Sequence, residues 1–167
     1  MKAKTVIVPS MVGTTAMTIF SYLVAASKDR KFEEPKLLAA LVKQILEKEY
    51  KGLAKPAGWA MHYTMGCVMA LAFQELWKQR KTVPTVKDGL ISGAVGGAAG
   101  ILIWQIVFKI CANMPNIPLK RFYGHLFLAH LVFGVTVAIT SRKGHSVKPR
   151  QSPKIANRRD TSNERLN

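Results

Sequence analysis

The sequence predicts an all-α membrane protein with four transmembrane helices, one interfacial amphipathic helix and a disordered basic C-terminal tail. Two observations lead to this fold class: long apolar stretches, and the basic connectors that separate them. A helix rises about 1.5 Å per residue, so it needs about 20 mostly apolar residues to cross about 30 Å of hydrocarbon. Stretches of this length occupy residues 6–26, 57–77, 89–111 and 121–140. We therefore expect one transmembrane domain, residues 1–141, and no second globular unit.

The first stretch has an alternative interpretation as a secretory signal. Lys2 and Lys4 precede its apolar residues, and Val24-Ala25-Ala26 resembles a small-residue cleavage site. An apolar run of about 20 residues is, however, longer than the roughly 7–15 residues typical of a signal peptide. We therefore expect residues 6–26 to remain as a membrane helix.

The connector between the first two stretches contains an amphipathic helix, expected at about residues 35–50. Pro35 follows two acids and opens this segment, and both proline and acids favour a helix N-terminus. One face of the helix is apolar, through Leu37, Leu38, Leu41, Val42, Ile45 and Leu46. The segment is too short and too charged to span a bilayer, so we expect it to lie in the outer interface or to cap the bundle. A partner-binding helix is the alternative.

The third stretch carries a glycine stripe, made of Gly89, Gly93, Gly96, Gly97 and Gly100. Small residues four apart let membrane helices approach closely and gain van der Waals contact. The first stretch offers a complementary surface, comprising Ser10, Gly13, Thr14, Ala16 and Thr18. We expect packing within one chain, with homodimerisation through the stripe as the alternative. A phosphate-binding loop is excluded because these glycines lie inside an apolar helix that no strand precedes.

The candidate functional residues are polar groups within the last three stretches: His62, Gln105, Lys109, His125 and His130. If both chain ends face the cytoplasm, helical rise places all of them in the outer half of the bundle. Imidazole titrates near pH 6.5 when unperturbed, so this cluster predicts a pH-responsive or proton-handling site. Hydrogen bonding between helices is an alternative role, and bis-histidine haem ligation by His62 and His130 is another. A metal site is not expected, because the acid nearest to a span interior, Glu75, lies at the opposite end.

Charge placement predicts the orientation in the membrane. The net charge is +16, and Lys and Arg near span ends tend to stay in the cytoplasm. Basic residues precede the first stretch, separate the second from the third and follow the fourth, so both termini are expected to be cytoplasmic. The tail, residues 142–167, is expected to be disordered and to attract anionic lipids. Nucleic-acid binding is not predicted, because no aromatic residues interleave its charges.

Short motifs within residues 57–142 carry a family resemblance. They are His62 with Gly66, a basic exit at 77–81, Asp88-Gly89-Leu-Ile-Ser-Gly-Ala, Tyr123-Gly124-His125, and His130 with Gly134. Together they resemble the YagU-like small inner-membrane proteins of bacteria. The resemblance implies a multi-pass inner-membrane protein that is linked to survival under acid stress and has no established enzymatic activity.

The sequence shows no catalytic constellation: no paired-carboxylate site, no recognisable nucleophile elbow and no phosphate loop. The leading hypothesis is a non-enzymatic bacterial inner-membrane protein that responds to pH or handles protons or a small solute. The lipid bilayer is its expected partner, with homo-oligomers or membrane-complex partners as further expectations. A structural or assembly subunit of a larger complex is the first alternative, and a haem electron carrier is the second.

Overall fold

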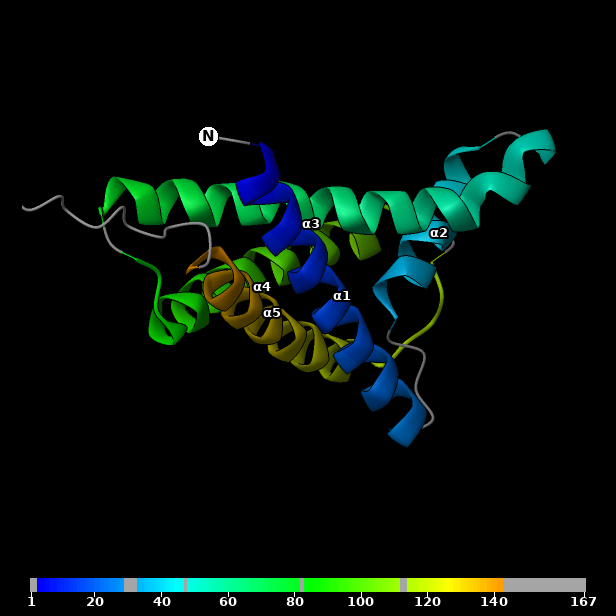
Figure 1. Ribbon diagram of the computed structural model, residues 1–167. Helices are drawn as coiled ribbons and strands as arrows, with labels where there is room; N and C mark the ends of the chain where they lie inside the picture. Colours follow the sequence, from blue (N-terminus) through cyan, green and yellow to red (C-terminus); the bar gives the residue numbers. More distant parts are fainter. Residues whose placement is uncertain (1–2, 29–32, 47, 82, 112–113, 143–167) are drawn as a thin grey trace, which may run out of the picture.

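The computed structural model describes residues 3–28, 33–46, 48–81, 83–111 and 114–142, which are nearly all helical and include no strand. The elements are α1 (Ala3–Lys28), α2 (Glu34–Ile45), a 3-10 helix η1 (Lys48–Leu53), α3 (Ala54–Gln79), α4 (Val86–Ile110) and α5 (Leu119–Arg142) (Figure 1). The predicted all-α class is confirmed. Residues 143–167, which make up nearly all of the predicted disordered tail, lie outside the described residues.

Among the described helices, three are long and apolar enough to cross a membrane: Lys4–Ala26, Val86–Ile110 and Leu119–Arg142. They match three of the four expected spans. The expected span 57–77 does form a helix, α3, and its 26 residues are sufficient in length. This helix is more polar than the others, because residues such as His62, Tyr63 and Gln74 interrupt its apolar sequence. Three of the four expected spans are therefore helices with the length and composition of a membrane span.

Local sequence signals account for the helix boundaries. α4 begins with a capping box, in which Asp88 N donates to Thr85 Oγ1 (3.2 Å) and Thr85 N donates to an Asp88 carboxylate oxygen (2.8 Å). α2 has its proline in the first turn, as expected, but it ends at Ile45 rather than near residue 50. The helix stops because Leu46 adopts an extended backbone, and the chain then turns through η1 into α3.

The helices alternate in direction through the bundle. α4 and α5 form an antiparallel pair, α1 packs on both α5 and α3, and α2 packs on α3. Figure 1 shows that the end of α1, the start of α3, the end of α4 and the start of α5 all lie near α2. We call this the α2 end of the bundle. The other end, which we call the far end, contains the start of α1, the end of α3, the start of α4 and the end of α5.

Two apolar clusters form the core. The larger cluster joins α1, α3 and α5 through Met17, Ala70, Phe73, Trp77, Ala129, Phe133, Val137 and Ala138. The smaller cluster lies at the α2 end and contains Leu37, Trp104, Phe122 and Leu126. Near the far end, Trp77 Nε1 donates to Ser92 Oγ (3.2 Å), which connects α3 to α4. The indole is fully buried, so this hydrogen bond satisfies its only donor.

The glycine stripe of α4 packs mainly on α5, which corrects the predicted pairing with the first helix. A Cβ on Gly93 would lie 2.5 Å from the His130 carbonyl oxygen, and a Cβ on Gly89 would lie 2.7 Å from that of Gly134. Gly97 and Gly100 also face α5, whereas Gly96 faces Met69 and Phe73 of α3. α5 occupies the groove because it is the antiparallel neighbour that follows α4 directly.

The small residues of α1 have other partners. A Cβ on Gly13 would lie 2.6 Å from Val137 Cγ2 of α5, and Thr14 lies against Gly66 of α3. Ser10 Oγ is 3.1 Å from Cys67 Sγ, also on α3. α1 therefore uses its small residues to fit into the angle between α3 and α5.

Candidate functional site

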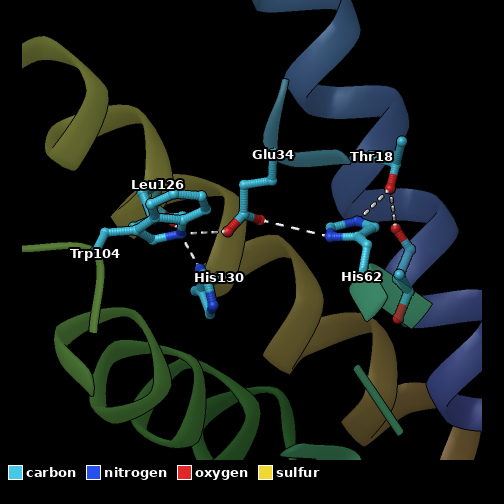
Figure 2. Close-up of polar contacts among 7 residues, drawn as sticks. Thr18, Glu34, His62, Trp104, Leu126 and His130 are labelled. Carbon is cyan, nitrogen blue, oxygen red and sulfur yellow. Dashed lines mark hydrogen bonds and ion pairs between the residues drawn. The ribbon is translucent and has the colours of Figure 1, made fainter. Parts of the chain in front are cut away.

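Glu34 places a carboxylate at the centre of the candidate site. It is the first residue of α2, and its side chain reaches the bundle between α3 and α4 (Figure 2). Oε1 accepts a hydrogen bond from Trp104 Nε1 (3.1 Å), and Oε2 lies 3.8 Å from His62 Nδ1. The Glu34 side chain is only 13% exposed. The carboxylate of Glu34 therefore links α2 to both α3 and α4.

His62 has hydrogen-bonding roles that its neighbours determine. Thr18 Oγ1 donates to the Thr14 carbonyl oxygen (2.7 Å) and lies 3.0 Å from His62 Nε2. A hydroxyl has one proton, and the carbonyl uses it, so Nε2 must donate to Thr18. In the neutral ring, Nδ1 then carries a lone pair that faces Glu34 Oε2. A proton on either atom is needed to turn this 3.8 Å approach into a hydrogen bond.

His130 has the opposite tautomer when neutral. Its Nδ1 lies 2.8 Å from the Leu126 carbonyl oxygen, which only accepts, so Nδ1 carries the proton. Nε2 then carries a lone pair and has no hydrogen-bond partner among the described residues. Gly100 allows this edge of the ring to approach α4, because a Cβ there would lie 3.3 Å from Nε2.

The structure brings together only part of the predicted cluster. His62 and His130 border one cavity, and His62 interacts electrostatically with both Glu34 and His130. His125 is buried between α5 and α1, where its ring stacks on Phe20 with centroids 5.7 Å apart. Gln105 and Lys109 are exposed, so they do not join the site. In α4 the positions facing the bundle are 100, 104 and 107, and helical rotation puts 105 and 109 on the outer face.

A cavity of about 210 Å³ lies beneath α2, between α3 and α4. Its lining is mostly apolar, and four methionines contribute to it, so we call it the methionine cavity. The lining residues are Met17, Glu34, Leu38, Leu41, Met61, His62, Met65, Gly66, Met69, Gly100, Ile103, Trp104, Val107, His130 and Phe133. All five α-helices therefore contribute to one chamber at the α2 end.

Contacts at the start of α2 hold it in place beside α1. Lys36 Nζ donates to Glu33 Oε1 (2.7 Å) and lies 5.7 Å from the centroid of the Tyr22 ring. The hydrogen bond to the Glu33 carboxylate raises the pKa of Lys36 above its ordinary value, so the ammonium stays charged at physiological pH. Leu37, 3% exposed, anchors the other side of this turn in the smaller core cluster.

Glu34 is the site residue that sequence analysis missed as a functional group. It was interpreted only as an acid that favours a helix N-terminus. A signal for its role was available, because Glu34, Leu38 and Leu41 follow the i, i+4, i+7 spacing of one helical face. An acidic residue on an otherwise apolar helical face predicts that its carboxylate is buried and has a polar partner.

The arrangement of potential ligand side chains is relevant to the metal and haem alternatives. Within the described residues, no group of three or more His, Cys, Asp or Glu side chains is arranged to hold a metal ion. Haem ligation by His62 and His130 stays a prediction. It would require His62 to exchange its contact with Thr18 or Glu34 for an iron bond.

Comparison of the chain with family models, with curated proteins and with solved structures finds no match. The resemblance to the YagU-like proteins therefore stays a prediction, and the functional argument depends on the geometry of the site.

Proposed function

We propose that this chain is a non-enzymatic, multi-pass protein of the bacterial inner membrane in which Glu34 and His62 respond to protons from the outer side. In this proposal α3 is the fourth transmembrane helix, both termini are cytoplasmic and α2 lies at the outer face. The observation that carries it is a carboxylate, 13% exposed, with its Oε2 held 3.8 Å from a buried imidazole nitrogen. Ionisable groups inside a membrane bundle are costly to bury, so their presence points to a function.

The pair can hold zero, one or two protons, with different effects on α2. With His62 neutral, the carboxylate of Glu34 is stabilised by the Trp104 indole, while its other oxygen faces a lone pair. A proton on His62 Nδ1 creates a charge-assisted contact between α2 and α3. A further proton on Glu34 removes the negative charge and leaves a buried imidazolium without its counter-charge. Acid should therefore first tighten and then loosen the docking of α2.

Other charged and polar groups face the pair from each helix packed against it. His130 of α5 interacts electrostatically with His62, and His125 of the same helix interacts with Glu34. On α2 itself, the charged Lys36 is paired with Glu33 at 2.7 Å. α1 contributes a hydroxyl, Thr18, and α4 contributes the Trp104 N–H. Protonation of either α5 histidine would add positive charge near the carboxylate and so favour its ionised form.

The decisive experiment measures amide hydrogen exchange of residues 34–45 in liposomes that contain only this protein. The external pH is stepped from about 7.5 to 5, a range that brackets the titration of an ordinary imidazole. Protection factors corrected for intrinsic exchange should change with acid in the native protein. Glu34→Gln retains an oxygen acceptor for Trp104 but removes the charge, so its α2 protection should not vary with pH.

Glu49→Gln is the matched control, because Glu49 is an exposed acid in the same connector and should leave the pH response intact. Protection of α2 that is independent of pH in the native protein would contradict the proposal and favour the structural-subunit alternative. Proton flux into the same liposomes distinguishes two forms of the function. Flux that appears with acid and disappears in Glu34→Gln indicates a proton pathway, whereas a change in exchange without flux indicates a sensor.

A further inference from the structure

The methionine cavity is large enough to hold a small molecule. Its volume is about 210 Å³. The engineered cavity of about 150 Å³ in T4 lysozyme, lined by apolar side chains, stays dry and binds benzene. A cavity of the present size and apolar character therefore has room for one aromatic ring with a short substituent.

The cavity opens on the outer faces of α3 and α4, which contact lipid when α3 spans the membrane as proposed above. Its α3 and α4 edges include Met61, Met65 and Ile103, which are 38%, 47% and 49% exposed. Exposed apolar side chains on membrane helices face hydrocarbon, so a ligand would enter from the bilayer. Such a ligand must be soluble in lipid.

One polar group in the cavity lacks a partner. His130 is 5% exposed and lines the cavity, and its Nε2 has no hydrogen-bond partner among the described residues. Because Nδ1 donates to the Leu126 carbonyl oxygen, Nε2 of the neutral ring is an acceptor. The Trp104 N–H, a donor in the cavity lining, is already bonded to Glu34 (Figure 2). The cavity thus offers acceptors to a ligand, and a ligand that fits it should bring a donor.

The lining favours an aromatic ring over an alkyl chain. Met17, Met61, Met65 and Met69 supply thioether sulfurs, which make favourable contacts with aromatic rings. Phe133 and Trp104 add aromatic surfaces of their own. Methionine is also flexible, so the walls can adapt to the shape of a ring.

We propose that the methionine cavity binds a membrane-dissolved phenol, with the ring among the methionines and the hydroxyl donating to His130 Nε2. This site requires no response of Glu34 or His62 to protons, so it goes beyond the function proposed above. Its recognition element is a hydroxyl on a ring that is otherwise apolar.

The test is methyl NMR of protein labelled with ¹³C-methyl methionine in detergent micelles. The chain has seven methionines, and four of them line the cavity. Met11 lies outside the cavity on an exposed face of α1 and reports ligand that merely partitions into the micelle. The probes are 4-ethylphenol and ethylbenzene, which differ by the hydroxyl alone.

The expected result is saturable shifts at Met17, Met61, Met65 and Met69, without a saturable shift at the control, Met11. A hydrogen bond of ordinary net strength makes the apparent Kd of 4-ethylphenol roughly three- to tenfold lower than that of ethylbenzene. His130→Leu, which removes the acceptor, should make the two probes bind equally.

A second variant keeps the test informative if His130→Leu does not fold. Met65→Trp should fill the cavity from its half-exposed edge and abolish the saturable shifts of the remaining lining methionines. Met11→Trp, a substitution at an exposed site on α1, should leave them unchanged. Equal affinity of the two probes for the native protein, or equal shifts at Met11 and at the lining methionines, would overturn the proposal.

Discussion

α4 contacts α5 and α3 in two different ways. On the α5 side, glycines bring the two backbones together, as at Gly93 and Gly89. On the α3 side, contact is made by long side chains, and towards the α2 end the helices border a cavity. A backbone contact has no side chain that can move aside, whereas methionines can repack. The comparison teaches that one helix can supply both a rigid interface and an adaptable one.

Inserting a side chain into the rigid interface should have the largest effect. In Gly93→Leu the new Cβ would meet the His130 carbonyl oxygen at 2.5 Å and Leu131 Cα at 3.0 Å. Both are backbone atoms, so α4 and α5 must separate, and we expect a loss of about 3 kcal/mol or more. The loss of stability is measured by thermal unfolding in detergent, with circular dichroism as the signal. Gly124→Leu, where no atom lies within 4 Å of the new Cβ, is the control and should unfold near the native temperature.

Removing the carboxylate at the α2 end should have the next largest effect. Glu34→Ala leaves the Trp104 N–H without its acceptor, which costs about 1–3 kcal/mol for a buried donor. We expect earlier proteolysis within residues 34–53 and a shift in Trp104 fluorescence. Glu34→Gln should lose less stability, since its amide oxygen can still accept the hydrogen bond from the indole. Equal losses in the two variants would show that this hydrogen bond does not anchor α2.

The contact between α1 and α3 should show strong coupling between two residues. In Gly66→Ala the new methyl group would overlap Thr14 Oγ1, so we expect a loss of about 1–3 kcal/mol from overpacking. Thr14→Ala removes the obstacle together with a buried hydroxyl that has no hydrogen-bond partner in the described part of the chain. The double variant should therefore recover most of the lost stability. Additive losses in a double-mutant cycle of unfolding free energies would contradict this contact.

Changing the adaptable interface should have the smallest effect. Met65→Leu conserves volume at a half-exposed position of the cavity, and we expect a loss below about 1.5 kcal/mol. The measurement is the same thermal unfolding used for Gly93→Leu. Similar losses of stability in Met65→Leu and Gly93→Leu would contradict the distinction between a rigid and an adaptable interface.

The helical elements were accessible to sequence analysis because their signals are local. Pro35 after two acids predicted the start of α2, and long apolar runs predicted α1, α4 and α5. The end of α2 was placed too late because apolar periodicity continues through Leu46, whereas the extended backbone of that residue ends the helix. The close-packing role of Gly89, Gly93 and Gly13 was also predicted, although their partners were not.

By itself the sequence determined where the helices form and which faces are small or polar, because these properties depend on residues a few positions apart. The tertiary structure alone decided that α5 fills the glycine groove, that Glu34 reaches Trp104 and His62, and that Gln105 and Lys109 stay outside. These outcomes depend on the rotation of each helix about its axis and on where α2 packs against the bundle. Both are set by contacts between residues distant in the chain, which local periodicity does not encode.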